Sequence, residues 1–108
     1  INIPQIWANV NMKGHWNKIH LHGHYDISGT YYIKVPKDSG SIVFRDPRPG
    51  AIGSMYMNKN FDGGELLPIS PNEGDLMLWP SYLDHFVEPS NSDEERISIS
   101  FDIVIINK

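Results

Sequence analysis

Residues 96–106 read RISISFDIVII, and apolar and polar side chains alternate along most of this stretch. Because successive side chains of a β-strand point to opposite faces, this period of two predicts a strand with one apolar and one polar face. The apolar face carries Ile97, Ile99, Phe101, Ile103 and Ile105, and the polar face carries Arg96, Ser98, Ser100 and Asp102. A polar face on a central strand of a small barrel is expected only where it lines a pocket.

The apolar face of this strand needs a cover, and no stretch of the chain has the 3.6-residue periodicity of an amphipathic helix. We therefore expect a second sheet, an N-terminal segment outside this sequence or a partner subunit to pack there. A homodimer is the cover that we favour.

Further strand-like segments, bounded by Gly, Pro, Asn or Asp, occur along the whole chain. They are residues 5–13, 17–22, 29–35, 41–46, 54–58, 65–70, 74–80 and 85–89, in addition to 96–106. Since no crossover helix separates them, they predict an all-β fold of about eight antiparallel strands, a jelly roll or related barrel. Residues 46–65, rich in Gly, Pro and Asn, are expected to form a loop that borders the pocket mouth.

Composition narrows the class of protein. A length of 108 residues suits one domain over 1–108, and the net charge of −4 argues against a nucleic-acid partner. Without cysteine, a metal ion can be held only by His, Asp or Glu. No apolar run is long enough to span a membrane and no secretion signal opens the sequence, so we expect a cytoplasmic protein.

The stretch NKIHLHGHYDIS (17–28) holds three histidines at alternate positions. On a strand, His20 and His22 point to the same side and can reach one metal ion, at about 2.0–2.1 Å from each nitrogen. Taken alone, this pair is more often a hydrated strand edge. His85 favours a metal site over a hydrated strand edge, because the spacing G-x5-P-x4-H from Gly74 puts it at a strand start beside a tight turn. The sequence therefore predicts a metal site of His20, His22 and His85.

Arg96 and Ser98 are neighbours on the polar face of the last predicted strand. A guanidinium fork beside a hydroxyl group suits a planar carboxylate that is bound through two hydrogen bonds. The alternative is that Arg96 pairs with Glu94 or Glu95 at the surface, and the spacing alone leaves both interpretations open.

Taken together, these stretches resemble the iron(II)/2-oxoglutarate oxygenases of marine bacteria and their phages, a group in the prolyl-hydroxylase-like superfamily. The resemblance covers residues 7–103 and rests on G-x5-H-x-H from Gly14, SGTYYIKVP, SGSIVFRDPRP, GDLMLWPSYLDHFVEP and RISISF. It implies a double-stranded β-helix, the cupin-like form of the jelly roll, with Fe(2+) and 2-oxoglutarate as cofactors. It also implies hydroxylation of a small-molecule or peptide substrate with O₂, in the cytoplasm of a bacterial or phage-infected cell.

The resemblance also implies roles for individual residues. His20 and His85 match the two metal histidines of the superfamily, and no catalytic residue is expected beyond the metal ligands. Arg96 matches the basic residue that binds the distal carboxylate of 2-oxoglutarate, with Ser98 completing an RxS motif. Tyr32 is similar to a tyrosine that often binds the same carboxylate.

Position 22 departs from the superfamily pattern, which usually has Asp or Glu there. Two histidines and one carboxylate leave open positions on iron, whereas three neutral imidazoles bring no negative charge to it. Either His22 is the third ligand, or Asp26 folds back after Gly23 to supply a carboxylate. We favour His22, because ligands at i and i+2 need no special backbone.

Two other functions fit the same residues. A cupin-like metal-dependent dioxygenase or isomerase would use the histidines without 2-oxoglutarate, and such a protein has no need of Arg96. A metal-free jelly-roll binding module would need neither the histidine site nor the arginine.

Overall fold

The computed structural model describes residues 1–20, 22–48 and 66–106, and the side chains of residues 19 and 20 lie outside that description. The described ranges contain eight strands and no helix. The strands are β1 (Asn2–Asn11), β2 (Asn17–His20), β3 (Ile27–Lys34), β4 (Ile42–Arg45), β5 (Leu66–Ile69), β6 (Leu76–Pro80), β7 (His85–Val87) and β8 (Arg96–Val104). The all-β prediction is confirmed. The strand predicted at 54–58 and most of the predicted loop 46–65 lie outside the described residues.

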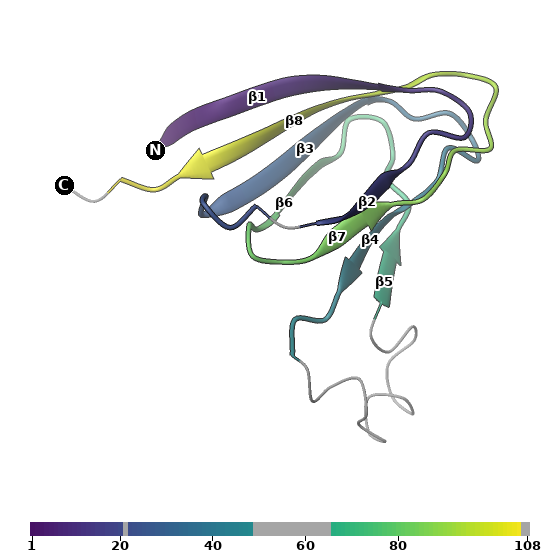
Figure 1. Cartoon of the computed structure of the whole chain (residues 1–108). Coiled ribbons are helices and arrows are strands. Elements are labelled where there is room, and N and C mark those ends of the chain that lie inside the picture. The colour runs from purple at the N-terminus through teal and green to yellow at the C-terminus, as the bar shows by residue number, and fades with distance from the viewer. Residues whose placement is uncertain (21, 49–65, 107–108) are drawn as a thin grey trace.

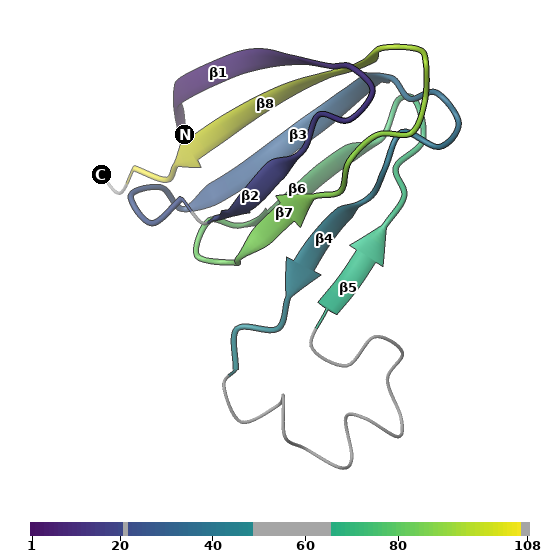
Figure 2. The ribbon, with the colours of Figure 1, turned by 45° about the vertical axis from the view of Figure 1, so that its right-hand side comes forward.

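The strands form two antiparallel sheets that face each other (Figure 1). The order is β1-β8-β3-β6 in the first sheet and β2-β7-β4-β5 in the second. Except at the β4–β5 hairpin, consecutive strands lie in opposite sheets, which is the winding of a jelly roll (Figure 2). The predicted jelly roll is therefore confirmed. Within the described part of the chain, no helix is long and apolar enough to cross a membrane.

The alternation of residues 96–106 is realised in β8. Its polar residues face the second sheet, and all of Arg96, Ser98, Ser100 and Asp102 line a cavity between the sheets. Its apolar residues share the outer face of the first sheet with apolar partners across the ladders, such as Ile6 opposite Phe101. The predicted pocket-lining face is thus correct, and it follows from the strand period alone.

The outer face of the first sheet is apolar and partly open to solvent. Its exposed large side chains include Ile6, Val10, Tyr31, Leu76 and Leu78. The second sheet packs on the opposite, polar side, so it is not the cover that the apolar residues of β8 require. Cover by an N-terminal segment or a partner subunit, including the favoured homodimer, stays a prediction.

The apolar core lies between the sheets. Its buried residues are Ile42, Phe44 and Trp79, against which Ile69, Met77, Leu83 and Val87 pack. The rings of Phe44 and Trp79 meet edge to face with centroids 5.2 Å apart, a favoured geometry for aromatic pairs. Trp79 also lines the cavity. The core therefore forms one wall of the site.

Candidate active site

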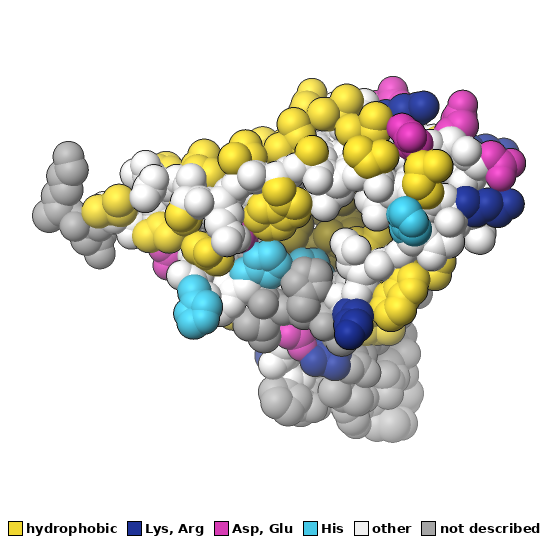
Figure 3. All heavy atoms as spheres, turned by 45° about the horizontal axis from the view of Figure 1, so that its top comes forward, with side chains coloured by type: hydrophobic (Ala, Val, Ile, Leu, Met, Phe, Trp, Pro, Cys, Tyr) yellow, Lys and Arg dark blue, Asp and Glu magenta, His cyan; other side chains and the backbone are white. Residues whose placement is uncertain are grey.

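The cavity between the sheets has a volume of about 540 Å³, within the range of small-molecule sites. The first sheet contributes Trp7, Tyr32, Trp79, Arg96, Ser98 and Asp102, and the second contributes Ile42, His85 and Val87. Figure 3 shows a hollow in the molecular surface, with histidine side chains beside it. Polar groups of both sheets thus converge on one space.

His85 opens β7 and lines this cavity, and the residue is 4% exposed. Its Nδ1 lies 3.0 Å from the carbonyl oxygen of Leu83, which can only accept, so Nδ1 carries the proton. The Trp79 ring packs edge to face on the imidazole with centroids 5.1 Å apart. These contacts fix the ring and its tautomer, with the lone pair on Nε2.

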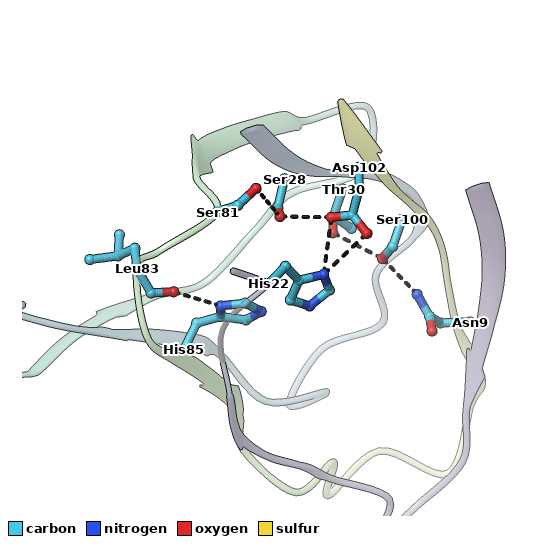
Figure 4. Close-up of polar contacts among 9 residues, drawn as sticks. All are labelled: Asn9, His22, Ser28, Thr30, Ser81, Leu83, His85, Ser100 and Asp102. Carbon is cyan, nitrogen blue, oxygen red and sulfur yellow. Dashed lines mark hydrogen bonds and ion pairs between the residues drawn. The ribbon is translucent and has the colours of Figure 1, made fainter. Parts of the chain in front are cut away.

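His22 lies beside His85, with ring centroids 5.6 Å apart, although it follows β2 rather than belonging to it. Its backbone amide donates to the carbonyl of Ser81 at 2.9 Å, and the indole of Trp7 stacks on its ring at 6.2 Å. Its Nδ1 lies 3.0 and 3.2 Å from the two carboxylate oxygens of Asp102 (Figure 4). The second imidazole is therefore also held through Nδ1.

Asp102 is fully buried and is the acidic partner that the sequence did not pair with a histidine. Ser28 donates to its Oδ1 at 2.8 Å, and the hydroxyl groups of Ser28 and Ser81 are 2.9 Å apart. The alternation of residues 96–106 already put Asp102 on the same polar face as Arg96. That signal located the carboxylate on the cavity wall but did not give its partner.

The other two candidate ligands, His20 and Asp26, lie in different positions relative to the cavity. The backbone of His20 pairs directly with His85 in the β2–β7 ladder, and its side chain lies outside the described part. The side chain of Asp26 is exposed, and its Oδ2 accepts the backbone amide of Ile105 at 2.7 Å. Asp26 is not among the cavity-lining residues. Among the described side chains, which do not include that of His20, no three His, Asp or Glu groups cluster as a metal site.

Arg96 lies in the cavity wall and is 4% exposed. Its Nη1 donates to the carbonyl oxygens of Ser39 at 2.8 Å and Gly40 at 3.2 Å. Burial lowers the pKa of the guanidinium, and the nearby Tyr32 partly opposes that effect. Surface pairing with Glu94 or Glu95 is therefore wrong for Arg96, which is a buried cation.

Tyr32 and Ser98 stand directly opposite each other in the β3–β8 ladder, beside Arg96. The side chain of Tyr32 is 5% exposed, and among the described residues its hydroxyl group has no hydrogen-bond partner. Burial raises the pKa of Tyr32 more than the positive charge of Arg96 lowers it, and Asp75 raises it further. The hydroxyl group consequently keeps its proton and can donate it into the cavity.

The residues present fit both a metal ion and a carboxylate ligand. Histidines that bind metals usually donate the other ring nitrogen to a carboxylate or a backbone carbonyl, and His22 and His85 show one case each. A guanidinium with a tyrosine hydroxyl and a serine hydroxyl nearby suits a carboxylate. Of the predicted residues, His22, His85, Arg96, Ser98 and Tyr32 line one cavity.

Comparison with known proteins gives one family. The family model described as “Putative 2OG-Fe(II) oxygenase”, where 2OG is 2-oxoglutarate, matches residues 5–102. No curated protein sequence matches the chain significantly.

Solved structures share the fold at low sequence identity. A 2OG-Fe(II) oxygenase-family oxidoreductase from Burkholderia pseudomallei has a TM-score of 0.72 at 17% identity, covering 94% of this chain and 43% of its own. A prolyl-4-hydroxylase from Pseudomonas putida has 0.66 at 18%, covering 94% and 51%. A cupin protein from Desulfovibrio desulfuricans has 0.51 at 13%, covering 93% and 72%. The chain thus spans about half the length of the two oxygenases.

Proposed function

The chain belongs to the 2OG-Fe(II) oxygenase family, and from this premise we propose that it carries the active site of an Fe(II)- and 2-oxoglutarate-dependent hydroxylase. The observation that carries the proposal is the cavity, in which two imidazoles oriented for metal binding share one space with a buried arginine. The proposed substrates are a small molecule or a peptide, together with O₂.

His85 and His22 would hold the iron through Nε2, because a carbonyl and a carboxylate already engage Nδ1 in each ring. His20 completes the proposed set, supported by the ladder register that pairs its backbone with His85. Bound iron with 2-oxoglutarate supplies O₂-dependent oxidation of a substrate, coupled to conversion of the cosubstrate to succinate and CO₂. Trp7 stacks on His22 and Trp79 packs edge to face on His85, so both rings are held in place.

Arg96 would bind the distal carboxylate of 2-oxoglutarate, with hydrogen bonds from the hydroxyl groups of Tyr32 and Ser98. The two backbone carbonyls that accept from Nη1 fix the guanidinium before the ligand arrives, which lowers the entropic cost of binding. The buried position strengthens this charge–charge interaction relative to one in water. Specific recognition of a dicarboxylate is the expected result.

The two other functions considered from the sequence receive less support. A cupin-like enzyme without 2-oxoglutarate gives no reason for the buried Arg96 in the cavity wall. A metal-free module gives no reason for two imidazoles held by acceptors side by side. Family membership favours the oxygenase over both.

Anaerobic addition of 2-oxoglutarate to the Fe(II)-loaded protein tests the proposal. We expect a weak visible charge-transfer band, followed by succinate formation when O₂ is admitted. The matched control is Arg96→Ala, which should keep the iron but lose the band at the same cosubstrate concentration. If the wild-type protein gives neither the band nor succinate at saturating 2-oxoglutarate, the proposal is wrong.

A further inference from the structure

The carboxylate of Asp102 has a partner set that is unusual for a buried charge. It is fully buried, and both of its oxygens lie within 3.2 Å of Nδ1 of His22. Its other side-chain partner is the neutral hydroxyl of Ser28. In the described ranges it contacts no Lys or Arg side chain. Because a buried charge is costly unless it is compensated, His22 is the described residue through which positive charge can reach this carboxylate.

We propose that Asp102 is a positioning residue of the metal centre, which fixes the Nδ1–H tautomer of His22 and supplies the negative charge that the histidine ligands lack. This inference rests on the proposed function. The carboxylate that the superfamily pattern has at position 22 is thereby replaced by a pair, with the imidazole in contact with the metal and the charge behind it.

The geometry supports an indirect action of Asp102. Its oxygens face Nδ1, on the ring edge away from Nε2, so the carboxylate reaches a metal ion only through the imidazole (Figure 4). A hydrogen bond of this kind raises the basicity of the ligand nitrogen and holds the ring orientation. A divalent cation at Nε2 would in turn compensate the buried negative charge.

Ser28 and Ser81 fix the direction of the carboxylate. Ser28 stands opposite Asp102 in the β3–β8 ladder, so the hydroxyl group that donates to Oδ1 comes from the neighbouring strand. Ser81 contacts the Ser28 hydroxyl from the turn after β6, and its backbone carbonyl accepts the amide of His22. The same small group of residues thus orients both members of the Asp102–His22 pair.

The first measurement is the tautomer of His22 in the metal-free protein, read from the imidazole ¹⁵N chemical shifts at pH 8.5. We expect the Nδ1–H form in the wild type. Observation of the Nε2–H form would overturn the proposal, and this readout does not depend on metal binding or activity.

The second measurement is Co²⁺ affinity, with the visible spectrum of the bound ion, in two variants. Asp102→Asn keeps a hydrogen-bond acceptor but removes the charge, and we expect binding weaker by about 10- to 100-fold with a shifted spectrum. Asp26→Asn is the control, because it makes the same change at an exposed carboxylate that does not line the cavity, and its affinity should stay within about threefold. Equal affinity and spectrum for Asp102→Asn and the wild type would overturn the proposal.

These outcomes separate the inference from the function on which it rests. If the wild type binds Co²⁺ and Asp102→Asn binds it weakly, but neither form binds 2-oxoglutarate, the hydroxylase proposal fails while the role of Asp102 stands. If Asp102→Asn does not fold, the tautomer in the wild type decides. A wild-type protein that binds no divalent metal contradicts both.

Discussion

At both ends of the cavity, hydrogen-bond acceptors hold the functional side chains from behind, but the two ends are built from different parts of the fold. At the proposed metal end, His22 and His85 are held by acceptors behind each ring. At the proposed carboxylate end, backbone carbonyls hold Arg96 from behind. The metal end, however, draws on both sheets, whereas Arg96, Ser98 and Tyr32 belong to two neighbouring strands of one sheet. Substitution of a proposed metal ligand should therefore cause a steep loss of metal affinity, whereas substitutions at the carboxylate end should weaken 2-oxoglutarate binding in graded steps.

The largest effect is expected from His85→Ala. Loss of a direct ligand should cost more than the 10- to 100-fold that is typical for an outer hydrogen-bond partner, so affinity for Fe(II) or Co²⁺ should fall by more than about 100-fold. Metal content after dialysis and titration with Co²⁺ measure this. The folded state is checked by circular dichroism, and stoichiometric, tightly bound metal in the variant would remove His85 from the site.

Arg96→Ala should weaken 2-oxoglutarate binding by about 30-fold or more, because removing one partner of a buried charge pair costs about 2–5 kcal/mol. Metal affinity should not change, which is the contrast with His85→Ala. Arg96→Lys serves as the graded control, since an ammonium group keeps the charge but lacks the planar fork. Calorimetric titration of the metal-loaded protein measures both constants. A parallel loss of metal in Arg96→Ala would contradict the independence of the two ends.

Tyr32→Phe should raise the dissociation constant of 2-oxoglutarate by about 2- to 12-fold, the equivalent of one hydrogen bond worth about 0.5–1.5 kcal/mol. The Tyr32 hydroxyl has no hydrogen-bond partner among the described residues, so its removal should not lower the free energy of unfolding. Chemical denaturation checks the stability, and the same titration as for Arg96 gives the affinity. An unchanged affinity would show that the hydroxyl does not reach the ligand.

The smallest effect concerns pH. Burial raises the pKa of Tyr32 in the folded protein above its ordinary value of 10.0. Below pH 10 the hydroxyl is protonated in both states, whereas above it the unfolded chain ionises first and the folded state loses stability. The free energy of unfolding should therefore fall less between pH 9 and about pH 11 in Tyr32→Phe than in the wild type. Urea unfolding at both pH values tests this. An equal fall in the free energy of unfolding in Tyr32→Phe and the wild type would contradict it.

The sequence predicted the cavity-lining face of β8 correctly, because the direction of these side chains depends on local structure. Arg96 and Ser98 share a face by the two-residue period of β8, and this face does line the cavity. Strand limits were less accurate, since β1 begins at Asn2 and β3 at Ile27, earlier than the alternation suggested. Strand ends are set by ladder partners such as Val104 opposite Asn2, which the local pattern does not contain.

What the sequence determined by itself was therefore the strand pattern, the absence of thiolate ligands and the face on which each polar side chain lies. Only the tertiary structure decided which carboxylate meets His22. Asp26 is close in sequence yet bonds to the amide of Ile105, whereas Asp102, 80 positions away from His22, lies against its ring. The strand period gives the direction of a side chain, but the partner across the cavity depends on how the two sheets pack, and that packing is a property of the whole chain.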